Sequence, residues 1–272
     1  MSKEKTPTKE QMCVFVGKIT ESEYNELPAL RCTYLKEFMK SPAHYKHIVS
    51  TPQKEETYFV IGDYVHTAIL EPEKLASKFA VADVKSRNAT EYKKVAAIAY
   101  GQGKRVLLKH EMEECDMMAA NALADPYFRD LVGLGYPEIT ATAKLQDVWC
   151  KCRMDLYIPE EKHIVDVKTS AESAHWFPYN VRKFGYDIQA AFYRDIVQKA
   201  SGEEINKVTF VLIEKKAPYA IRLFEITKRY MDDASLRYGG ALTRYLECLS
   251  KNNWPSYDNS SPEILDLKGD VE

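Results

Sequence analysis

Hydrophobic residues recur at helical spacing through the first half of the chain. Leu30, Leu35 and Phe38 fall on one face of a helical pattern that runs from residue 22 to residue 46 and is interrupted by two prolines. The same period predicts further helices over residues 58–75, 90–100 and 109–124, and a short one that begins at residue 125. Residues 1–25 are polar, and we expect them to form a loose or only partly docked segment.

The period changes after residue 137. Residues 138–146, 149–157 and 163–168 alternate in polarity or are β-branched, and short polar turns separate them, which predicts three strands in an antiparallel meander. Two helices are predicted next over 171–184 and 187–200, then strands over 207–213 and 221–226, and a last helix over 228–250. Residues 28–250 contain no repeat and no linker-like composition, so the pattern predicts one α/β domain with helical decoration.

Composition narrows the class of protein. Of the 272 residues 45% are hydrophobic, which suffices for a sizeable core, and the formal net charge of −2 excludes a general basic coat for gripping nucleic acid. A local basic groove is still compatible with this charge. The longest unbroken apolar run, residues 95–100, is far too short for a membrane span, and the polar N-terminus lacks an apolar signal core. We therefore expect a cytoplasmic protein with no membrane partner.

The six cysteines are scattered and none belongs to a C-x-x-C pair. This usage favours a reducing compartment with buried free thiols and argues against an iron–sulfur cluster, which needs four well-placed thiolates. The chain also lacks a Gly-rich phosphate-binding loop. We therefore expect no nucleotide cofactor and no built-in helicase motor.

The most informative segments are Arg153-Met-Asp155 and Asp166-Val-Lys168. Because side chains alternate along a strand, Arg153, Asp155 and Tyr157 should share one face. The opposite, apolar face of that strand should consist of Cys150, Cys152, Met154 and Leu156.

Asp166 and Lys168 should likewise share a face of the next strand, with Val165 and Val167 turned into the core. A short hairpin can bring Asp155 and Asp166 opposite each other, because they are 11 residues apart. Two close carboxylates repel each other unless a cation lies between them, and their hard oxygen atoms favour Mg²⁺, with Mn²⁺ as the other candidate. The Lys168 ammonium could then position or activate a water for attack on a phosphodiester.

The alternative is a surface hairpin with an ordinary Asp–Lys pair. Three further residues favour a nuclease site: Glu138 on the preceding strand, and Gln189 and Tyr193 one turn apart on the following helix. Each has a structural alternative too. Glu138 could be solvated on an edge strand, and Gln189 and Tyr193 could simply border the apolar stripe of their helix.

These motifs resemble those of the PD-(D/E)XK nuclease superfamily, and within it the exonuclease VIII (RecE-type) branch. The resemblance covers most of the chain and is carried by residues 30–38 with 41–43, 62–73, 150–155, 166–169, 189–193 and 254–255. It implies a restriction-endonuclease-like α/β core, a central mixed β-sheet flanked by helices, with N-terminal helical decoration. The expected division is a polar N-terminal segment (1–25), the exonuclease domain (26–257) and an acidic C-terminal tail (258–272). The family's usual Pro-Asp dipeptide is Met154-Asp155 here, which removes a rigid residue but no ligand.

The resemblance assigns roles to individual residues. Asp155 and Asp166 would be metal ligands, Val167 would contribute its carbonyl, and Lys168 would be the catalytic lysine. Glu138 corresponds to an earlier acidic residue that assists a metal or a metal-bound water. His66 matches a helical histidine of the metal shell, although a lone histidine is more often a core or surface residue.

The remaining candidates support the site or contact DNA. Gln189 and Tyr193 resemble a motif that braces the lysine and touches the DNA backbone. Arg153 lies two residues before Asp155 on the same predicted face and could meet a phosphate, and Thr169 follows the lysine in its motif.

By this resemblance the protein is a 5′-to-3′ exodeoxyribonuclease on linear double-stranded DNA. It would release 5′-mononucleotides and leave a 3′ single strand for a RecT-like annealing partner in phage recombination. We expect a ring homo-oligomer, a tetramer in preference to a trimer, because a chain with net charge −2 would hold duplex weakly as a monomer. The alternatives are a RecB-like single-strand nuclease, which often carries a four-cysteine cluster, and a DNA-end-binding protein with a degenerate site.

Overall fold

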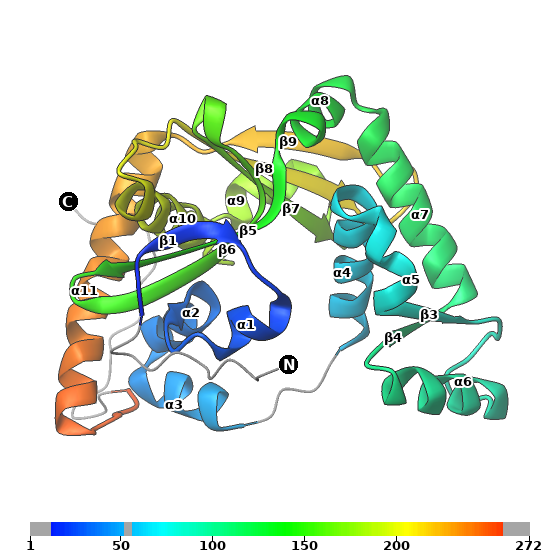
Figure 1. Cartoon of the computed structure of the whole chain (residues 1–272), viewed down its shortest axis with the longest axis horizontal. Helices are drawn as coiled ribbons and strands as arrows, with labels where there is room; N and C mark the ends of the chain where they lie inside the picture. The colour runs from blue at the N-terminus through cyan, green and yellow to red at the C-terminus, as the bar shows by residue number, and fades with distance from the viewer. Residues whose placement is uncertain (1–11, 52–55, 258–272) are drawn as a thin grey trace, which may run out of the picture.

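The protein folds around a seven-stranded mixed β-sheet (Figure 1). The structure is a computed structural model and describes residues 12–51 and 56–257. The strand order is β1-β5-β6-β7-β8-β9, and the short β2 also pairs with β6. Among the described strands of this sheet, only the β2–β6 and β7–β8 pairs are parallel. The strands of this sheet are β1 (Phe15–Lys18), β2 (Leu30–Arg31), β5 (Tyr136–Leu145), β6 (Val148–Ile158), β7 (His163–Ser170), β8 (Lys207–Glu214) and β9 (Ile221–Glu225).

Helices cover both faces of the sheet, as the fold prediction requires (Figure 1). One face packs against α2 (Cys32–Lys40), α10 (Tyr186–Ser201) and α11 (Lys228–Lys251), with α3 (Pro42–Ser50) outside α2. The other face packs against α4 (Thr57–Leu70), α7 (Lys109–Ala124) and α8 (Pro126–Leu134). Each side therefore has its own apolar core. The predicted α/β restriction-endonuclease-like architecture is confirmed.

A small lobe lies beside α4 and α7 and has a separate apolar cluster (Figure 1). It consists of α5 (Leu75–Lys78), β3 (Phe79–Ala82), α6 (Thr90–Gly101) and β4 (Arg105–Leu108), with β3 and β4 paired in parallel. Lys78 and Arg105 both form ion pairs with Asp63 of α4, which fastens the lobe to that helix. The sequence pattern predicts α6 but not the two strands, because four residues are too few to show a period of two.

The local pattern predicts most elements with nearly the observed bounds. The strands β5, β6 and β7 form the expected antiparallel meander. The helix predicted over 171–184 is wrong, because this segment contains only a 3-10 turn (Ala174–Trp176) and the short α9 (Phe177–Asn180). Pro178 lies in this short helix, and Gly185 just after the segment adopts a left-handed conformation, so one continuous helix does not form.

The expectation of a loose N-terminal segment is wrong for its described part. β1 pairs antiparallel with β5, and α1 (Glu21–Glu26) begins with a capping box between Thr20 and Glu23. Lys18 also forms an ion pair of 2.6 Å with Glu71, which is buried at the end of α4. Pairing with a distant strand leaves no local signal in so short a polar segment. Residues 1–11 and the predicted C-terminal tail lie outside the described residues.

The turn between α8 and β5 depends on close packing at Gly135. A Cβ atom there would lie 2.5 Å from Cγ of Leu156, which is buried. We expect Gly135→Ala to lower the free energy of unfolding by about 1–3 kcal/mol, because the core must shift to admit the methyl group. Gly133→Ala is the matched control, since its Cβ would meet no atom within 4 Å and alanine favours the helix. Urea denaturation of both variants measures the difference, and equal stability of the two would contradict this packing argument.

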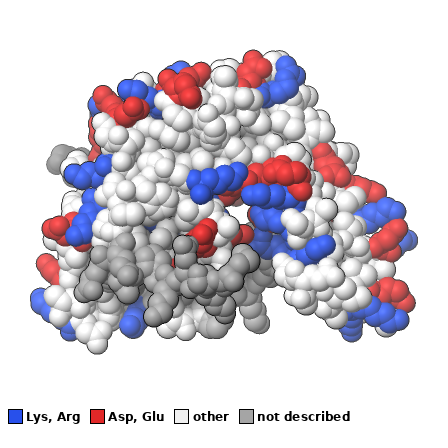
Figure 2. Space-filling view, in the orientation of Figure 1, with Lys and Arg blue, Asp and Glu red and all other residues white. Residues whose placement is uncertain are grey.

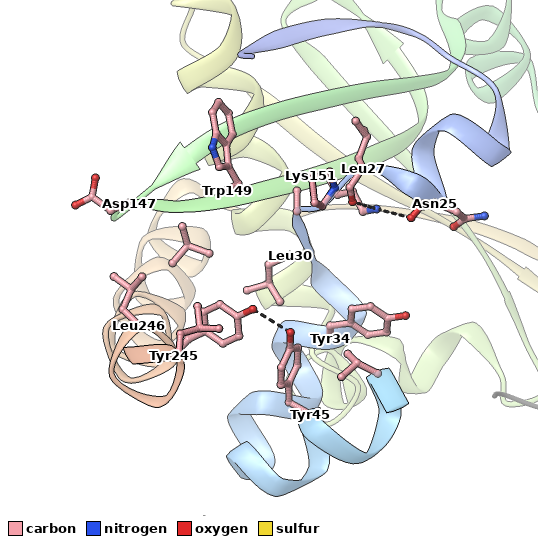
Figure 3. A pocket seen from close by; sticks show the side chains of 15 residues that line it. Asn25, Leu27, Leu30, Tyr34, Tyr45, Asp147, Trp149, Lys151, Tyr245 and Leu246 are labelled. Atoms are coloured by element: carbon pink, nitrogen blue, oxygen red, sulfur yellow. Dashed lines mark hydrogen bonds between the residues drawn. The ribbon is translucent and has the colours of Figure 1, made fainter. Parts of the chain in front are cut away.

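A cavity of about 460 Å³ lies between β2, α2, α3, β6 and α11 (Figure 3). Tyr34, Tyr45, Trp149 and Tyr245 contribute its aromatic lining. The Nζ atom of Lys151 donates hydrogen bonds to three backbone carbonyls at the end of α1, so it is already satisfied. The described lining includes none of the predicted site residues. The candidate site therefore lies elsewhere.

No helix in the described ranges is long and apolar enough to cross a membrane. Five of the six cysteines are buried free thiols, as expected, and Cys13 is exposed. Figure 2 shows Lys and Arg side chains interspersed with Asp and Glu over the described part of the face in view. That face carries no general basic coat.

Candidate active site

Three carboxylates lie on one rung across β5, β6 and β7. The β5–β6 register on either side of this rung places Glu138 opposite Asp155. The last β6–β7 pair is Leu156 with Val165, so the next rung brings Asp155 opposite Asp166. The sheet thus holds three acidic side chains next to one another, as the 11-residue spacing predicted for the two aspartates.

The strands β6 and β7 separate at this rung, and a side chain takes the place of a ladder hydrogen bond. The Asp155 carboxylate accepts a hydrogen bond of 2.7 Å from the backbone N–H of Val167. Because the N–H and C=O of one strand residue point to the same side, the Val167 carbonyl also faces this gap. From α4, His66 Nδ1 lies 3.5 Å from the same Asp155 oxygen.

Lys168 and Gln189 hold the Asp166 carboxylate from the other side. The Lys168 ammonium forms an ion pair with one Asp166 oxygen. Gln189 Nε2 on α10 donates a hydrogen bond of 2.7 Å to the other oxygen. Side chains from α10 on one face of the sheet and from α4 on the opposite face therefore meet at the gap between β6 and β7. Gln189 thus contacts Asp166, the ion-pair partner of Lys168, and its predicted roles in bracing the lysine and touching DNA stay predictions.

Glu138 has an unusual backbone for a non-glycine residue. Its φ is 57°, in the left-handed region, and this interrupts the β5–β6 ladder at that residue. The guanidinium of Arg153 lies 3.8 Å from the Glu138 carboxylate, donates to the Thr20 carbonyl at 3.1 Å and stacks 4.3 Å from the Tyr24 ring. Arg153 thus links Glu138 to the N-terminal segment. Its predicted contact with a phosphate stays a prediction.

The same rung breaks the alternation predicted for β6. Cys150, Cys152 and Met154 share one core face as expected, but Leu156 packs in the opposite core cluster and Tyr157 returns to the first. The predicted placement of Leu156 and Tyr157 is therefore wrong. The physical reason is the irregular backbone opposite Asp155, which a period of two cannot anticipate.

Burial and mutual repulsion shift the titration of the carboxylates. Burial and the charge of Asp166 raise the pKa of Asp155 to about 7. Burial and the charge of Asp155 raise the pKa of Glu138 to about 7 as well. Carboxyl groups crowded in this way take up protons unless positive charge is supplied.

The two basic groups shift in opposite directions. Burial and the nearby Lys168 ammonium lower the pKa of His66, which favours a neutral imidazole. Burial opposes the charge on Lys168, but Asp166 and Asp155 together raise the pKa of this lysine. Lys168 therefore carries its positive charge at neutral pH.

The other two predicted residues lie at the margin of the site. Tyr193 on α10 is half-buried and packs against the core, and burial raises its pKa well above the ordinary value. Thr169 follows Lys168 on β7, and a Cβ on Gly62 of α4 would lie 3.5 Å from its hydroxyl oxygen. The structure brings both residues near the carboxylates but gives neither a hydrogen bond to another described site residue.

Sequence reasoning missed two aromatic residues that contact the basic side chains. The Tyr24 ring stacks against Arg153, and the Tyr186 ring lies 5.6 Å from Lys168 Nζ. Tyr186 directly precedes the predicted start of α10, and an aromatic residue at a helix start close to Gln189 was the available signal. Tyr24 offered none, because it reaches the site through the unforeseen β1–α1 segment.

The donor set fits a hard divalent cation. Carboxylate and carbonyl oxygens are the ligands that Mg²⁺ and Mn²⁺ prefer, and the crowded carboxylates are an arrangement that a cation would relieve. Within the described ranges, no three His, Cys, Asp or Glu side chains form a ready-made ligand group. Asp166 instead contacts Lys168 and Gln189, which supply hydrogen bonds and positive charge to it.

Comparison with known proteins agrees with the fold. The candidate exonuclease of Eubacterium rectale, a solved structure, is 21% identical, with a TM-score of 0.67 over 92% of this chain and 95% of its own. A phage-related exonuclease of Haemophilus somnus is 14% identical, with a TM-score of 0.39 over 83% of this chain and 96% of its own. At 21% identity the likeness to the Eubacterium rectale structure concerns the fold alone. No protein of curated function matches the sequence significantly.

The mixed sheet and the acidic rung define a PD-(D/E)XK-type α/β domain. Within that superfamily the chain belongs to the PDDEXK-like domain family of unknown function (DUF3799), whose model matches residues 31–262.

Proposed function

We propose that this protein is a divalent-metal-dependent exodeoxyribonuclease of the RecE type. It degrades linear double-stranded DNA from 5′ to 3′, releases 5′-mononucleotides and leaves a 3′ single strand. The observation that carries the proposal is the rung of Glu138, Asp155 and Asp166 with Lys168 paired to its last member. The PD-(D/E)XK family membership supports phosphodiester hydrolysis, and the exonuclease name of the Eubacterium rectale structure agrees with it.

The site residues would have two main roles, metal binding and stabilisation of charge at the phosphate. Asp155, Asp166, the Val167 carbonyl and His66 would hold Mg²⁺ or Mn²⁺, which supplies charge neutralisation at the scissile phosphate. Lys168 is charged at neutral pH, so it acts by stabilising negative charge on a phosphate oxygen and by orienting a water.

Two neighbours support these groups. Gln189 holds Asp166 in place through its 2.7 Å hydrogen bond, which fixes the carboxylate toward the gap. Glu138, whose pKa is about 7, can accept a proton near neutral pH.

Digestion of end-labelled duplex with Mg²⁺ tests the proposal. Blunt duplexes labelled at the 5′ or the 3′ end are compared with labelled single strands. Early release of labelled mononucleotide from the 5′ end of duplex is the expected result. Release from the 3′ end would overturn the polarity, preference for single strands would favour a RecB-like nuclease, and DNA binding without cleavage would indicate a degenerate site.

His66→Ala should weaken the metal dependence more than DNA binding. Loss of one imidazole should raise the Mg²⁺ concentration for half-maximal cleavage about 10-fold or more. Activity of the wild type in Mn²⁺ could exceed that in Mg²⁺, because imidazole suits Mn²⁺ better. Cleavage is titrated against each metal, with DNA binding measured separately. His110→Ala, an exposed histidine on α7, is the control, and an unchanged titration for His66→Ala would make His66 a structural residue.

We also propose that the active species is a cytoplasmic ring, a tetramer in preference to a trimer, that hands its 3′ strand to a RecT-like annealing protein. The support is the net charge of −2 and the interspersed charges on the face in view, which would let a monomer release duplex quickly (Figure 2). A ring encloses the duplex and makes escape difficult. Light scattering gives the mass in solution, and a monomeric mass with cleavage quenched at once by competitor DNA would refute the ring.

A further inference from the structure

An aromatic ladder runs from the core to the surface beside Lys168. The Tyr186 ring lies 5.6 Å from Lys168 Nζ, and the buried Phe177 stacks on Tyr186 at 5.5 Å. The Phe184 ring lies 5.7 Å from Tyr186 on its outer side and is 44% exposed. Since both distances share the Tyr186 ring centre, the Phe184 ring lies at most about 11 Å from Lys168 Nζ.

The backbone that presents Phe184 is held firmly. Gly185 has a φ of 63°, and a Cβ on it would lie 2.7 Å from Cδ of Lys36. The Lys36 ammonium donates a hydrogen bond of 3.2 Å to the Phe184 carbonyl and lies 5.9 Å from the Tyr186 ring. Phe184 is therefore exposed on a braced turn, and the ammonium groups of Lys36 and Lys168 lie 5.9 Å and 5.6 Å from the ring of its neighbour Tyr186.

A nucleotide matches this surface through both its base and its phosphates. A flat apolar ring suits the face of a base, and base–aromatic stacking tolerates any sequence because every base has a π-face. Two ammonium groups near the Tyr186 ring suit the phosphates that adjoin such a base. An interior base of a duplex is stacked on both faces, so the surface fits a base at a strand end with a free face, and a single protruding phenyl ring matches one unpaired base better than the full width of a terminal base pair.

We propose that Phe184 and Tyr186 form a stacking platform for one unpaired base of the strand being cut, next to the phosphate that Lys168 faces. This inference rests on the proposed nuclease function and deepens it. The platform makes the active site specific for a strand end that has left the duplex.

Pairing a protein variant with a substrate variant tests the platform. Phe184→Ala should lower kcat/KM about 10-fold on duplex with a normal end. Wild type should lose a similar factor on a duplex whose nucleotide next to the cut is abasic, and Phe184→Ala should lose nothing further on that substrate. Phe184→Trp should keep the activity, because an indole also stacks.

Two controls separate stacking from general surface effects. Tyr179→Ala removes a more exposed ring of the same segment, 72% exposed, and should leave the kinetics unchanged. A duplex with 2-aminopurine as its end base reports stacking without cleavage, because stacking quenches its fluorescence. Wild type should quench it and Phe184→Ala should not.

The outcomes distinguish this inference from the proposed function. If Phe184→Ala on the abasic substrate lost the product of the two separate factors in kcat/KM, the two changes would be independent and the platform would be overturned. Equal quenching of 2-aminopurine by wild type and Phe184→Ala would overturn it as well. Normal kinetics of Phe184→Ala on all substrates would also overturn the platform and would indicate that the exposed Phe184 ring contacts a protein partner instead. Quenching by wild type without any metal-dependent cleavage would support the platform and overturn the nuclease function alone.

Discussion

Asp166→Asn and Lys168→Ala should each lower the rate of DNA cleavage at least about 100-fold, because both act on charge at the reacting phosphate. The two side chains form one ion pair on β7, braced by Gln189. The double variant should therefore lose little more than either single variant, as expected for residues that act as a unit. Single-turnover cleavage of labelled duplex measures the rates.

Two controls test whether a loss of cleavage comes from unfolding or from the removal of any charged side chain. Circular dichroism and thermal denaturation should show that each variant retains the native structure. Lys199→Ala removes an exposed lysine from α10 and should cleave at the wild-type rate. Near-normal turnover of a folded Asp166→Asn or Lys168→Ala protein would remove this ion pair from the catalytic machinery.

Glu138→Gly should produce a protein that is more stable and much less active. An L-residue in the left-handed region costs about 1–2 kcal/mol, which glycine avoids. The substitution also removes one of three crowded carboxylates, so cleavage should fall about 10-fold or more while repulsion on the rung decreases.

Glu138→Ala is the matched comparison, because it removes the same carboxylate but keeps a Cβ atom. Both variants should lose activity equally, and the glycine variant should exceed the alanine variant by about 1 kcal/mol in the free energy of unfolding. Urea denaturation and single-turnover cleavage together give the answer. A glycine variant no more stable than the alanine variant would show that the backbone of Glu138 is unstrained.

The sequence predicts local elements and the acidic pair because both depend on short-range spacing. Helix α7 has the predicted bounds, and the 11 residues between Asp155 and Asp166 suffice to place the two carboxylates on neighbouring strands. The alternation rule fails at Leu156, where the strand leaves its regular pleat opposite Glu138. A backbone irregularity has no period, so hydrophobic patterning does not reveal it.

Long-range pairing explains the other misses. β2 has two residues and β1 has four, and each gains its stability from a partner more than 100 residues away. The positions of Tyr24 beside Arg153 and of Phe184 near Lys168 depend on such tertiary placement, since their neighbours in sequence resemble those of any surface aromatic residue. Sequence alone thus predicted the charged residues that the structure brings together and missed the aromatic residues that lie beside them.

The family match begins at residue 31, but the structural unit begins earlier. Without residues 12–30 the long strand β5 would become an open edge, and an unpaired edge is a template for aggregation. The Lys151 ammonium would at the same time lose its three carbonyl acceptors and the Tyr24 ring that covers it. The N-terminal strand and helix therefore cover both the edge of β5 and the Lys151 ammonium, and a boundary drawn from sequence similarity would cut through this structural unit.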